Sequence, residues 1–326
     1  MTVERSDLEI RPITGPAELD LFVRPPYVLN DELAADLDDG HRQPGWMWVA
    51  LRGDRLVARA AWWGSPERSS PALLDIFDID DDTEDDESMQ IGEQLLRTAM
   101  AAVVPSGTQP PEYVRFIPPD WRDHAASLRV VEDRMTAAER TGARLVVERL
   151  RLEWRPGTPV PARTGRLDFR PANDPGELIA LMTLVMDGTL DVHGRDDLTR
   201  MTPAQAAAKH FNGELALYKS PHAWWRIASL PGGEPVGFVI PARNDYNPII
   251  AYLGVLPAHR GHGYIGEILA EGTRILAAEN VPRIRSTTDV GNVPMANAFH
   301  RAGWITFEGQ ISMAWPKEDA SRLATS

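Results

Sequence analysis

The sequence predicts an α/β protein made of two related halves, each with a mixed, mostly antiparallel β-sheet flanked by helices. Two observations lead to this fold class. An internal repeat divides the 326 residues, and strand-like and helix-like segments alternate within each half. The chain is also longer than one hydrophobic core usually fills, which favours two domains.

The internal repeat appears at three places, in the same order in both halves. Residues 8–19, LEIRPITGPAEL, match residues 167–178, LDFRPANDPGEL. The second pair is formed by residues 46–61 and 224–240. Each segment has two apolar stretches around a glycine-containing turn, as in a β-hairpin. A third pair consists of RTGARLVVERLRLEW and RAGWITFEGQISMAW. Because the three pairs occur in the same order, and the first and third are both offset by about 160 residues, we infer a duplication.

The boundary between the halves is expected where neither helix nor strand can form. Residues 155–166, RPGTPVPARTGR, contain three prolines and two glycines, which is typical of a linker. The expected organisation is therefore a first domain over residues 1–155, a linker over 156–166, a second domain over 167–316 and a polar tail over 317–326.

Each element of the second half follows from its local pattern. Apolar residues spaced three and four apart favour an amphipathic helix over 264–278, whereas short apolar runs favour strands. The expected elements are, in order, a strand at 167–170, helices at 175–186 and 203–217, the hairpin, a strand at 249–255, a helix at 264–278, a strand at 283–288 and a helix at 293–302.

Composition restricts the classes of partner. The formal net charge of −13 opposes nucleic-acid binding, which needs a basic face. No apolar run approaches the roughly 20 residues that span a bilayer, and the charged N-terminus does not resemble a secretory signal. Cysteine is absent, which excludes disulfides and thiolate nucleophiles. A cytoplasmic protein without nucleic-acid or membrane partners is expected.

An acidic run lies in the first half. Nine of the thirteen residues from Asp75 to Glu87 are acidic. A calcium-binding EF-hand loop starting at Asp78 would need Gly at its sixth position and Glu at its twelfth, where Thr83 and Met89 stand. We therefore predict a solvated surface loop and no metal site.

Four tryptophans occupy the strands expected near the first hairpin: Trp46, Trp48, Trp62 and Trp63. Large aromatic side chains on strands are most often part of the core, and we expect this here. The alternative is that they line a substrate-binding wall.

The turn from His259 to Gly263, HRGHG, lies between an apolar strand and an amphipathic helix. A helix start presents unpaired N–H groups and a partial positive charge. Glycines allow the backbone to approach a bulky anion, and Arg260 can donate a charge-assisted bond to a phosphate oxygen. These properties together indicate a pyrophosphate cradle, although such a turn can also simply reverse the chain.

The segment 255–266, VLPAHRGHGYIG, resembles the signature [RQ]-x-x-G-x-[GA] of the GNAT superfamily of N-acetyltransferases. Arg260 and Gly263 match its first and fourth positions, whereas Ile265 replaces the usual small residue and Gly266 follows it. About 40 residues further on, the segment from Asn292 to Trp304 resembles the family pattern N-x(6)-[YF]-x(3)-G-[FYW]. The resemblance covers residues 167–315, and the tandem layout is similar to that of the mycothiol synthases.

The resemblance implies specific roles for residues that bind acetyl-CoA as a co-substrate. Backbone groups of Gly254, Val255 and Leu256 would hold the pantetheine arm and polarise the thioester carbonyl. The pyrophosphate would be bound by Arg260 together with the backbone N–H groups of Gly261, His262, Gly263, Tyr264, Ile265 and Gly266. Asn292 would bond to the pantetheine region. Phe299 takes the position of the tyrosine that protonates the CoA thiolate in many members, which leaves Tyr264 and His300 as weaker proton donors.

The proton acceptor is not fixed by the sequence. A primary amine is mostly protonated at neutral pH and must lose a proton before it attacks a thioester. Candidate bases are His193, Asp245, Tyr252 and Asp289, with Asp187, Asp191 and Tyr246 close to them in sequence. For His193, an ordinary loop histidine bonded to the backbone is an equally good interpretation. Alignment of amine and thioester alone can contribute several kcal/mol.

The resulting hypothesis is an acyltransferase that moves an acetyl group from acetyl-CoA to a primary amine of a small molecule, by direct attack in a ternary complex. The acidic composition favours a cationic acceptor. The alternatives are a non-catalytic acyl-CoA-binding regulatory protein and a pure interaction module. The first half has no Arg-x-x-Gly turn, and its carboxylates would repel pyrophosphate, so that we expect only the second half to bind acetyl-CoA.

Overall fold

The computed structural model describes residues 8–67, 70–82 and 85–316, so that the predicted tail at 317–326 lies outside the described residues. The chain packs into two compact units. The second unit is Glu148–Gly309, and the first unit combines the residues up to Val147 with those from Gln310 on. This division differs from the predicted one, which placed a linker at 156–166 between two continuous domains. The reason is that two long strands are each shared between the units: β6 (Arg144–Trp154) and β12 (Ile305–Ala314).

The second unit contains a mixed sheet, as predicted. Its strand order is β7-β8-β9-β10-β11, followed by the end of β6. All neighbours are antiparallel except β10 and β11, which run parallel. The strands are β7 (Asp168–Pro171), β8 (Arg226–Ser229), β9 (Pro235–Arg243), β10 (Pro248–Val255) and β11 (Ile284–Asp289).

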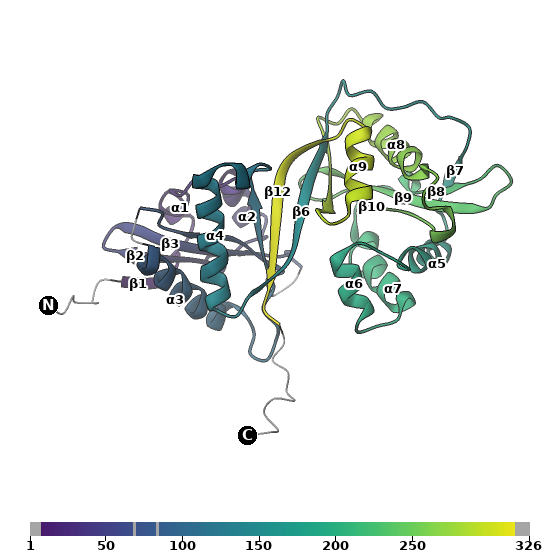
Figure 1. Cartoon of the computed structure of the whole chain (residues 1–326). Helices are drawn as coiled ribbons and strands as arrows, with labels where there is room; N and C mark the ends of the chain where they lie inside the picture. Colours follow the sequence, from purple (N-terminus) through teal and green to yellow (C-terminus); the bar gives the residue numbers. More distant parts are fainter. Residues whose placement is uncertain (1–7, 68–69, 83–84, 317–326) are drawn as a thin grey trace. The chain divides into compact units, whose positions relative to one another are not determined.

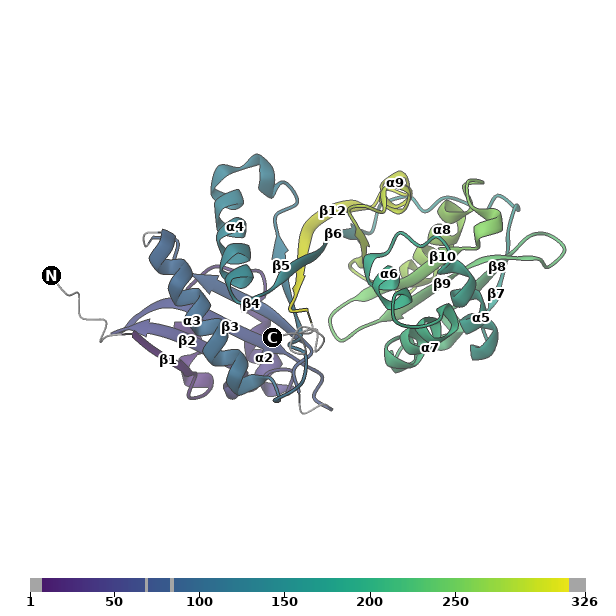
Figure 2. The ribbon, with the colours of Figure 1, turned by 60° about the horizontal axis from the view of Figure 1, so that its bottom comes forward.

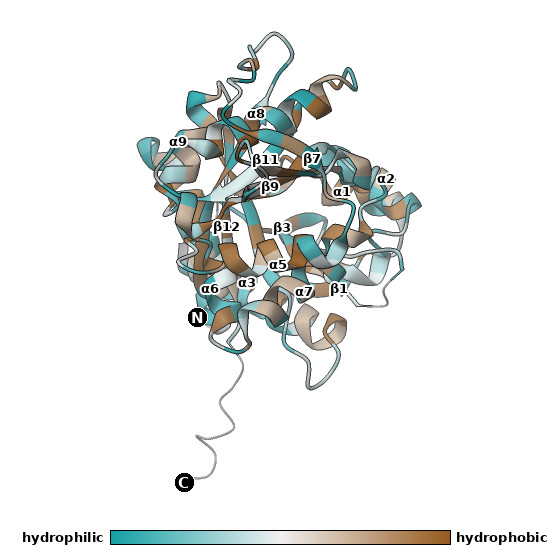
Figure 3. Cartoon of the chain, turned by 90° about the vertical axis from the view of Figure 1, so that its right-hand side faces the viewer, coloured by the Kyte–Doolittle hydropathy of each residue, from teal (hydrophilic) through white to brown (hydrophobic). Residues whose placement is uncertain are grey.

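Helices cover both faces of this sheet (Figure 1). One face carries α5 (Pro175–Val185), α6 (Val192–Leu198) and α7 (Pro203–Gly213), and the other carries α8 (Tyr264–Ala277) and α9 (Val293–Arg301). The predicted helices are confirmed, but α6 was missed because its seven residues, VHGRDDL, have no apolar stripe. Helix α8 carries both hydrophilic and hydrophobic residues along its length (Figure 3).

Strands β10 and β11 separate toward their carboxyl ends. Among the described residues they pair only at Ile249 and Arg285. The register of β10 with β9 also shifts between Ile250 and Tyr252, which marks a β-bulge. The backbone of β10 beyond the bulge therefore faces β9 on one side and no paired strand on the other, as far as Val255.

The first unit repeats this arrangement. Its strands are β1 (Leu8–Pro12), β2 (Met47–Arg52), β3 (Arg55–Trp63), β4 (Leu73–Ile79) and β5 (Glu112–Ile117), followed by the end of β12. Within the described ranges, parallel β4 and β5 again pair at one end only, through Leu73 with Glu112 and Leu74 with Tyr113. The helices are α1 (Leu19–Phe22), α2 (Leu33–Asp38), α3 (Asp85–Val103) and α4 (Ala125–Arg140). Figure 2 shows α2, α3 and α4 from a second direction.

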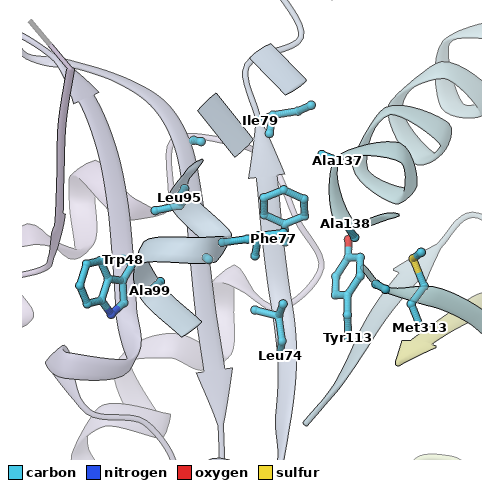
Figure 4. Packing of buried hydrophobic residues seen from close by; sticks show 14 of the residues in the cluster. Trp48, Leu74, Phe77, Ile79, Leu95, Ala99, Tyr113, Ala137, Ala138 and Met313 are labelled. Atoms are coloured by element: carbon cyan, nitrogen blue, oxygen red, sulfur yellow. The ribbon is translucent and has the colours of Figure 1, made fainter. Parts of the chain in front are cut away.

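The core of the first unit forms on both faces of its sheet. Met47 and Val49 of β2 pack in the cluster that includes α1 and α2, whereas Trp48 belongs to the cluster that includes α3 and α4. Figure 4 shows Met313 of β12 beside Tyr113 of β5 in this second cluster. The prediction of a core role is confirmed for Trp46, Trp48 and Trp62, which are all buried.

The prediction of a solvated acidic loop is wrong for its first part. Asp75 and Asp78 lie on β4 and are buried. Arg42 donates two bonds of 2.7 Å to Asp75. Asp78 accepts from Arg59 at 2.9 Å and from Arg115 at 3.1 Å. Each buried carboxylate is thus paired with a buried arginine, which the acidic run by itself does not reveal.

The predicted linker forms neither helix nor strand, as expected, but it is packed onto the second unit. Arg163 donates two bonds to the buried carboxylate of Glu271 on α8, at 2.6 and 3.0 Å. Arg274 of α8 donates to the carbonyl of Pro161 at 2.6 Å. The linker is therefore a strap across α8.

None of the described helices is long and apolar enough to cross a membrane.

Candidate functional site

The turn between β10 and α8 has the geometry of an anion cradle. Gly261 and Gly263 have φ values of +82° and +77°, which non-glycine residues rarely adopt. Within the described part of the chain, no acceptor is bonded to the backbone N–H groups of residues 261–265. These donors lie at the N-terminus of the 14-residue helix α8, whose macrodipole adds partial positive charge. The turn is exposed, so that a phosphate group can reach it.

The side chain of Arg260 does not point to this cradle. Its guanidinium donates to the carbonyls of Val185 at 2.8 Å and Asp187 at 2.7 Å, at the C-terminal end of α5. It also donates to the carbonyl of Val255 at 3.2 Å. Arg260 was expected to bind phosphate, and its contacts do not agree with this. Its N–H groups are bonded to carbonyls at the end of α5, which have no partner within the helix. Asp187, a candidate base, contributes its backbone carbonyl here.

Arg166 of the strap is the cation that lies at the cradle. It donates to the carbonyl of His262 at 2.8 Å, and its guanidinium carbon is 4.7 Å from the centre of the Tyr264 ring. Tyr264 also stacks on the ring of His262. The carboxylate of Glu267 lies 3.2 Å from Arg166. Sequence reasoning missed Arg166 because the residue lies far upstream, in a segment that was interpreted as a linker.

A cavity of about 250 Å³ opens beside the cradle, between the strap and helices α8 and α9. Its lining includes Arg166, Gly263, Gly266 and Arg301. Arg301 is exposed and has no ion-pair partner among the described residues. The cavity therefore combines a free cation with the edge of the anion cradle.

Helix α9 starts as predicted, but one of its predicted site residues lies in the core. The Asn292 side chain caps the helix by accepting from the N–H of Met295 at 3.4 Å. Phe299 is fully buried, and its ring packs edge-on against Trp304 at 5.0 Å. This position is thus a packing position here, which corrects its expected contact with the co-substrate. His300 instead pairs with the Thr306 hydroxyl at 3.0 Å.

Three candidate base residues meet at Arg149 of β6. Arg149 donates to Asp289 at 2.8 Å, to His193 Nδ1 at 2.8 Å and to Asp191 at 3.4 Å. The second oxygen of Asp289 accepts from the N–H of Val192 at 2.7 Å, and Asp289 is buried. Both oxygens of Asp289 and one ring nitrogen of His193 are therefore occupied. This arrangement ties α6 to β11 and is a poor one for removing a proton from a substrate.

Asp245 and Tyr246 lie away from the cradle. They belong to the tight turn between β9 and β10, where the Asn244 side chain accepts from the N–H groups of Tyr246 and Asn247. This turn precedes β10, whereas the cradle follows it. Eight extended residues span roughly 25 Å, so that the structure does not bring Asp245 to the end of β10.

Tyr252 of β10 is brought close to residues that sequence reasoning missed. Its ring lies 4.8 Å from that of His210 on α7, and Nε2 of His210 lies 3.4 Å from the Glu214 carboxylate. Tyr218 donates to Glu214 at 2.8 Å. The spacing of His210 and Glu214, four apart near a helix end, was the available sequence signal, but it is also common on ordinary helix surfaces.

Comparison with known proteins agrees with this geometry. Residues 191–304 match the model of the acetyltransferase (GNAT) family. No curated protein matches the chain by sequence. The chain is similar to solved structures of GCN5-related N-acetyltransferases from Sphaerobacter thermophilus (15% identity, 97% of this chain and 98% of that one, TM-score 0.56) and Kribbella flavida (12%, 91% and 99%, 0.50). A tandem GNAT protein from the clavulanic acid biosynthesis pathway matches at 13% identity, over 96% and 100% of the chains, with a TM-score of 0.48.

The family match lies entirely within the second unit. The likeness to the Sphaerobacter structure extends over nearly the whole chain and therefore includes the fold of the first unit. Acyl transfer is the general chemistry of this family. The splayed β10 and β11 and the glycine turn before α8 both lie in the second unit.

Proposed function

We propose that the chain is an N-acetyltransferase that transfers the acetyl group of acetyl-CoA to a primary amine of a small molecule in a ternary complex. The observation that carries this proposal is the row of unbonded N–H groups at residues 261–265, placed directly after the unpaired end of β10. Pyrophosphate would accept from these groups, with Arg166 and Arg301 as the nearby cations. Backbone groups of Gly254, Val255 and Leu256 would then face the pantetheine arm.

The first unit is proposed not to bind acetyl-CoA. Arg134 of α4 donates to the carbonyl of Ile79, the last residue of β4, and to both oxygens of Asp81. Its guanidinium therefore occupies backbone and side-chain acceptors at the strand end that corresponds to Val255. Repulsion by carboxylates was the reason expected from the sequence, and a buried arginine at the strand end is a second, independent one.

The test is a calorimetric titration of the chain with acetyl-CoA, followed by detection of free CoA thiol with putrescine, glucosamine and ethanolamine as acceptors. We expect one binding event per chain and amine-dependent thiol release. Saturable binding without thiol release would contradict the enzyme and favour the acyl-CoA-binding regulatory protein. No binding would overturn the proposed function altogether.

A further inference from the structure

Five polar side chains gather on the face of β10 opposite α8. We call them the α7 cluster, and they are His210, Glu214, Tyr218, Tyr252 and Asp191. The hydrophobic contacts of Tyr252 and Tyr218 are with the α5 and α7 side of the sheet. Tyr252 precedes Gly254 by two residues, which places the cluster about 7 Å along the strand from the expected thioester position.

Within the α7 cluster, a carboxylate orients an imidazole. Nε2 of His210 lies 3.4 Å from Glu214, and no other hydrogen bond of this ring exists among the described residues. Although partial desolvation opposes ionisation of the exposed Glu214 side chain, the bonds from His210 and Tyr218 and the charge of Arg149 lower the pKa of its carboxyl below the usual range. Glu214 is therefore an anion at neutral pH and accepts a hydrogen bond from the Nε2 proton of His210, so that the neutral tautomer of this ring has its lone pair on Nδ1.

The rest of the α7 cluster suits a cation. Burial, aided by the charge of Asp191, raises the pKa of Tyr252, so that its phenol stays protonated. The Tyr252 hydroxyl has no hydrogen-bond partner in the described part of the chain and can orient a ligand. Arg149 is the positively charged side chain that faces the cluster, but it forms ion pairs with the buried Asp289 and with Asp191. Two carboxylates and aromatic faces remain to attract an ammonium group.

We propose that the α7 cluster binds the primary ammonium group of the acceptor and that Nδ1 of His210 removes its proton. This inference rests on the proposed function. The ammonium nitrogen gives one proton to His210, which passes it to solvent, and the freed lone pair forms a bond to the thioester carbonyl carbon. The C–S bond then breaks, the sulfur leaves as thiolate, and the second proton lost by the nitrogen neutralises it. The products are the N-acetyl amine and CoA thiol.

His193, the histidine predicted from the sequence, is less suitable for this step. Arg149 can only donate, so that Nδ1 of His193 must accept and its lone pair is occupied. His210 has the opposite arrangement, because its partner Glu214 can only accept. Both neutral rings therefore carry their proton on Nε2, and they differ in that the Nδ1 lone pair is bonded to Arg149 in His193 but has no bond in His210 among the described residues.

The test compares two acceptors with His210→Ala and with wild type. With putrescine, whose nitrogens are protonated at pH 7, we expect kcat/KM to fall about 100-fold or more. With hydroxylamine, which is already unprotonated, we expect a fall of less than about fivefold. Calorimetry should give the same acetyl-CoA affinity for both proteins, and thermal melting verifies folding. Glu214→Gln should follow the same acceptor pattern more weakly. His222→Asn should match wild type, because His222 is stacked on Trp225 and is not a member of the α7 cluster.

The outcomes separate the two proposals. Equal losses with putrescine and hydroxylamine would show a merely structural His210 and overturn the inference, while the proposed function would stand. An unchanged kcat/KM of His210→Ala with putrescine would also overturn the inference and leave the proposed function standing. Acetyl-CoA binding without thiol release from any acceptor would overturn both, as would an absence of acetyl-CoA binding.

Discussion

Arg260 illustrates how a long side chain beside an anion-binding turn can serve the turn itself. Its donors are bonded to carbonyls at the end of α5 and to the carbonyl of Val255. Gly188 passes close to this guanidinium, because a Cβ there would lie 3.1 Å from one of its nitrogens. The guanidinium thus fixes the end of β10 against α5, and in the proposed function the backbone and Arg166 would provide the phosphate contacts.

Replacing Arg260 by alanine should therefore lower the stability of the fold more than the affinity for acetyl-CoA. Charge-assisted bonds contribute more than neutral ones, but the site is exposed, so that we expect a loss of about 1 kcal/mol in the free energy of unfolding. Urea unfolding of the unliganded chain measures it. Arg166→Ala is the matched comparison, with weaker acetyl-CoA binding and a smaller change in stability. Unchanged stability of Arg260→Ala together with a large loss of affinity would contradict this assignment.

At the scale of elements, β9 and β10 approach each other closely at two glycines. A Cβ on Gly237 would lie 2.2 Å from the carbonyl oxygen of Gly254 and 2.9 Å from Ile268 of α8. No side chain can be accommodated there without moving β10, the strand that is expected to hold the pantetheine arm. Gly266 in the first turn of α8 is different, because a Cβ there would meet no atom within 4 Å.

The pair Gly237→Ala and Gly266→Ala tests this difference. We expect Gly237→Ala to lower the unfolding free energy by about 2–3 kcal/mol through overpacking. Gly266→Ala should leave it unchanged or raise it by up to about 1 kcal/mol, since alanine favours a helix. Thermal and urea unfolding of the unliganded proteins provide the comparison. A destabilised Gly266→Ala or a tolerated Gly237→Ala would contradict the packing described.

These elements also show what the sequence could and could not predict. The strand, glycine turn and helix around residues 248–277 were predicted closely, because their signals are local. The burial of Asp75 and Asp78 was missed, since their arginine partners come from other elements. The contacts of Arg260, Phe299 and the α7 cluster likewise depend on residues distant in sequence. Local patterns predicted the strand and the helix on either side of the glycine turn, whereas the directions of the side chains depend on tertiary packing.

At the scale of the whole molecule, the first unit depends on buried charge. Asp78 faces Arg59, Arg115 and Arg134, all buried. Burial alone would raise its pKa, but the three arginines outweigh it and lower the pKa from 3.8 to about 2. Stability from this carboxylate is therefore complete above about pH 4 and is lost as the pH falls toward 2.

We expect this pH dependence to disappear in Asp78→Asn. The depressed pKa corresponds to about 2 kcal/mol of unfolding free energy between pH 5 and pH 2. Urea unfolding of wild type and variant across that range isolates the contribution, because other acidic groups affect both proteins equally. Asp82→Asn, at an exposed position, should retain the wild-type slope. Parallel curves for wild type and Asp78→Asn would exclude the proposed linkage.

The sharing of β6 and β12 has a consequence for the order in which the molecule is made. During synthesis the N-terminus of the chain leaves the ribosome first, and domains usually fold as they emerge. The first unit nevertheless needs Ile311, Met313 and Trp315 for its core, so that it stays incomplete until nearly the last residues of the described chain have been synthesised. The second unit needs nothing beyond Gly309. During biosynthesis, the half that is translated first is therefore the half that is finished last.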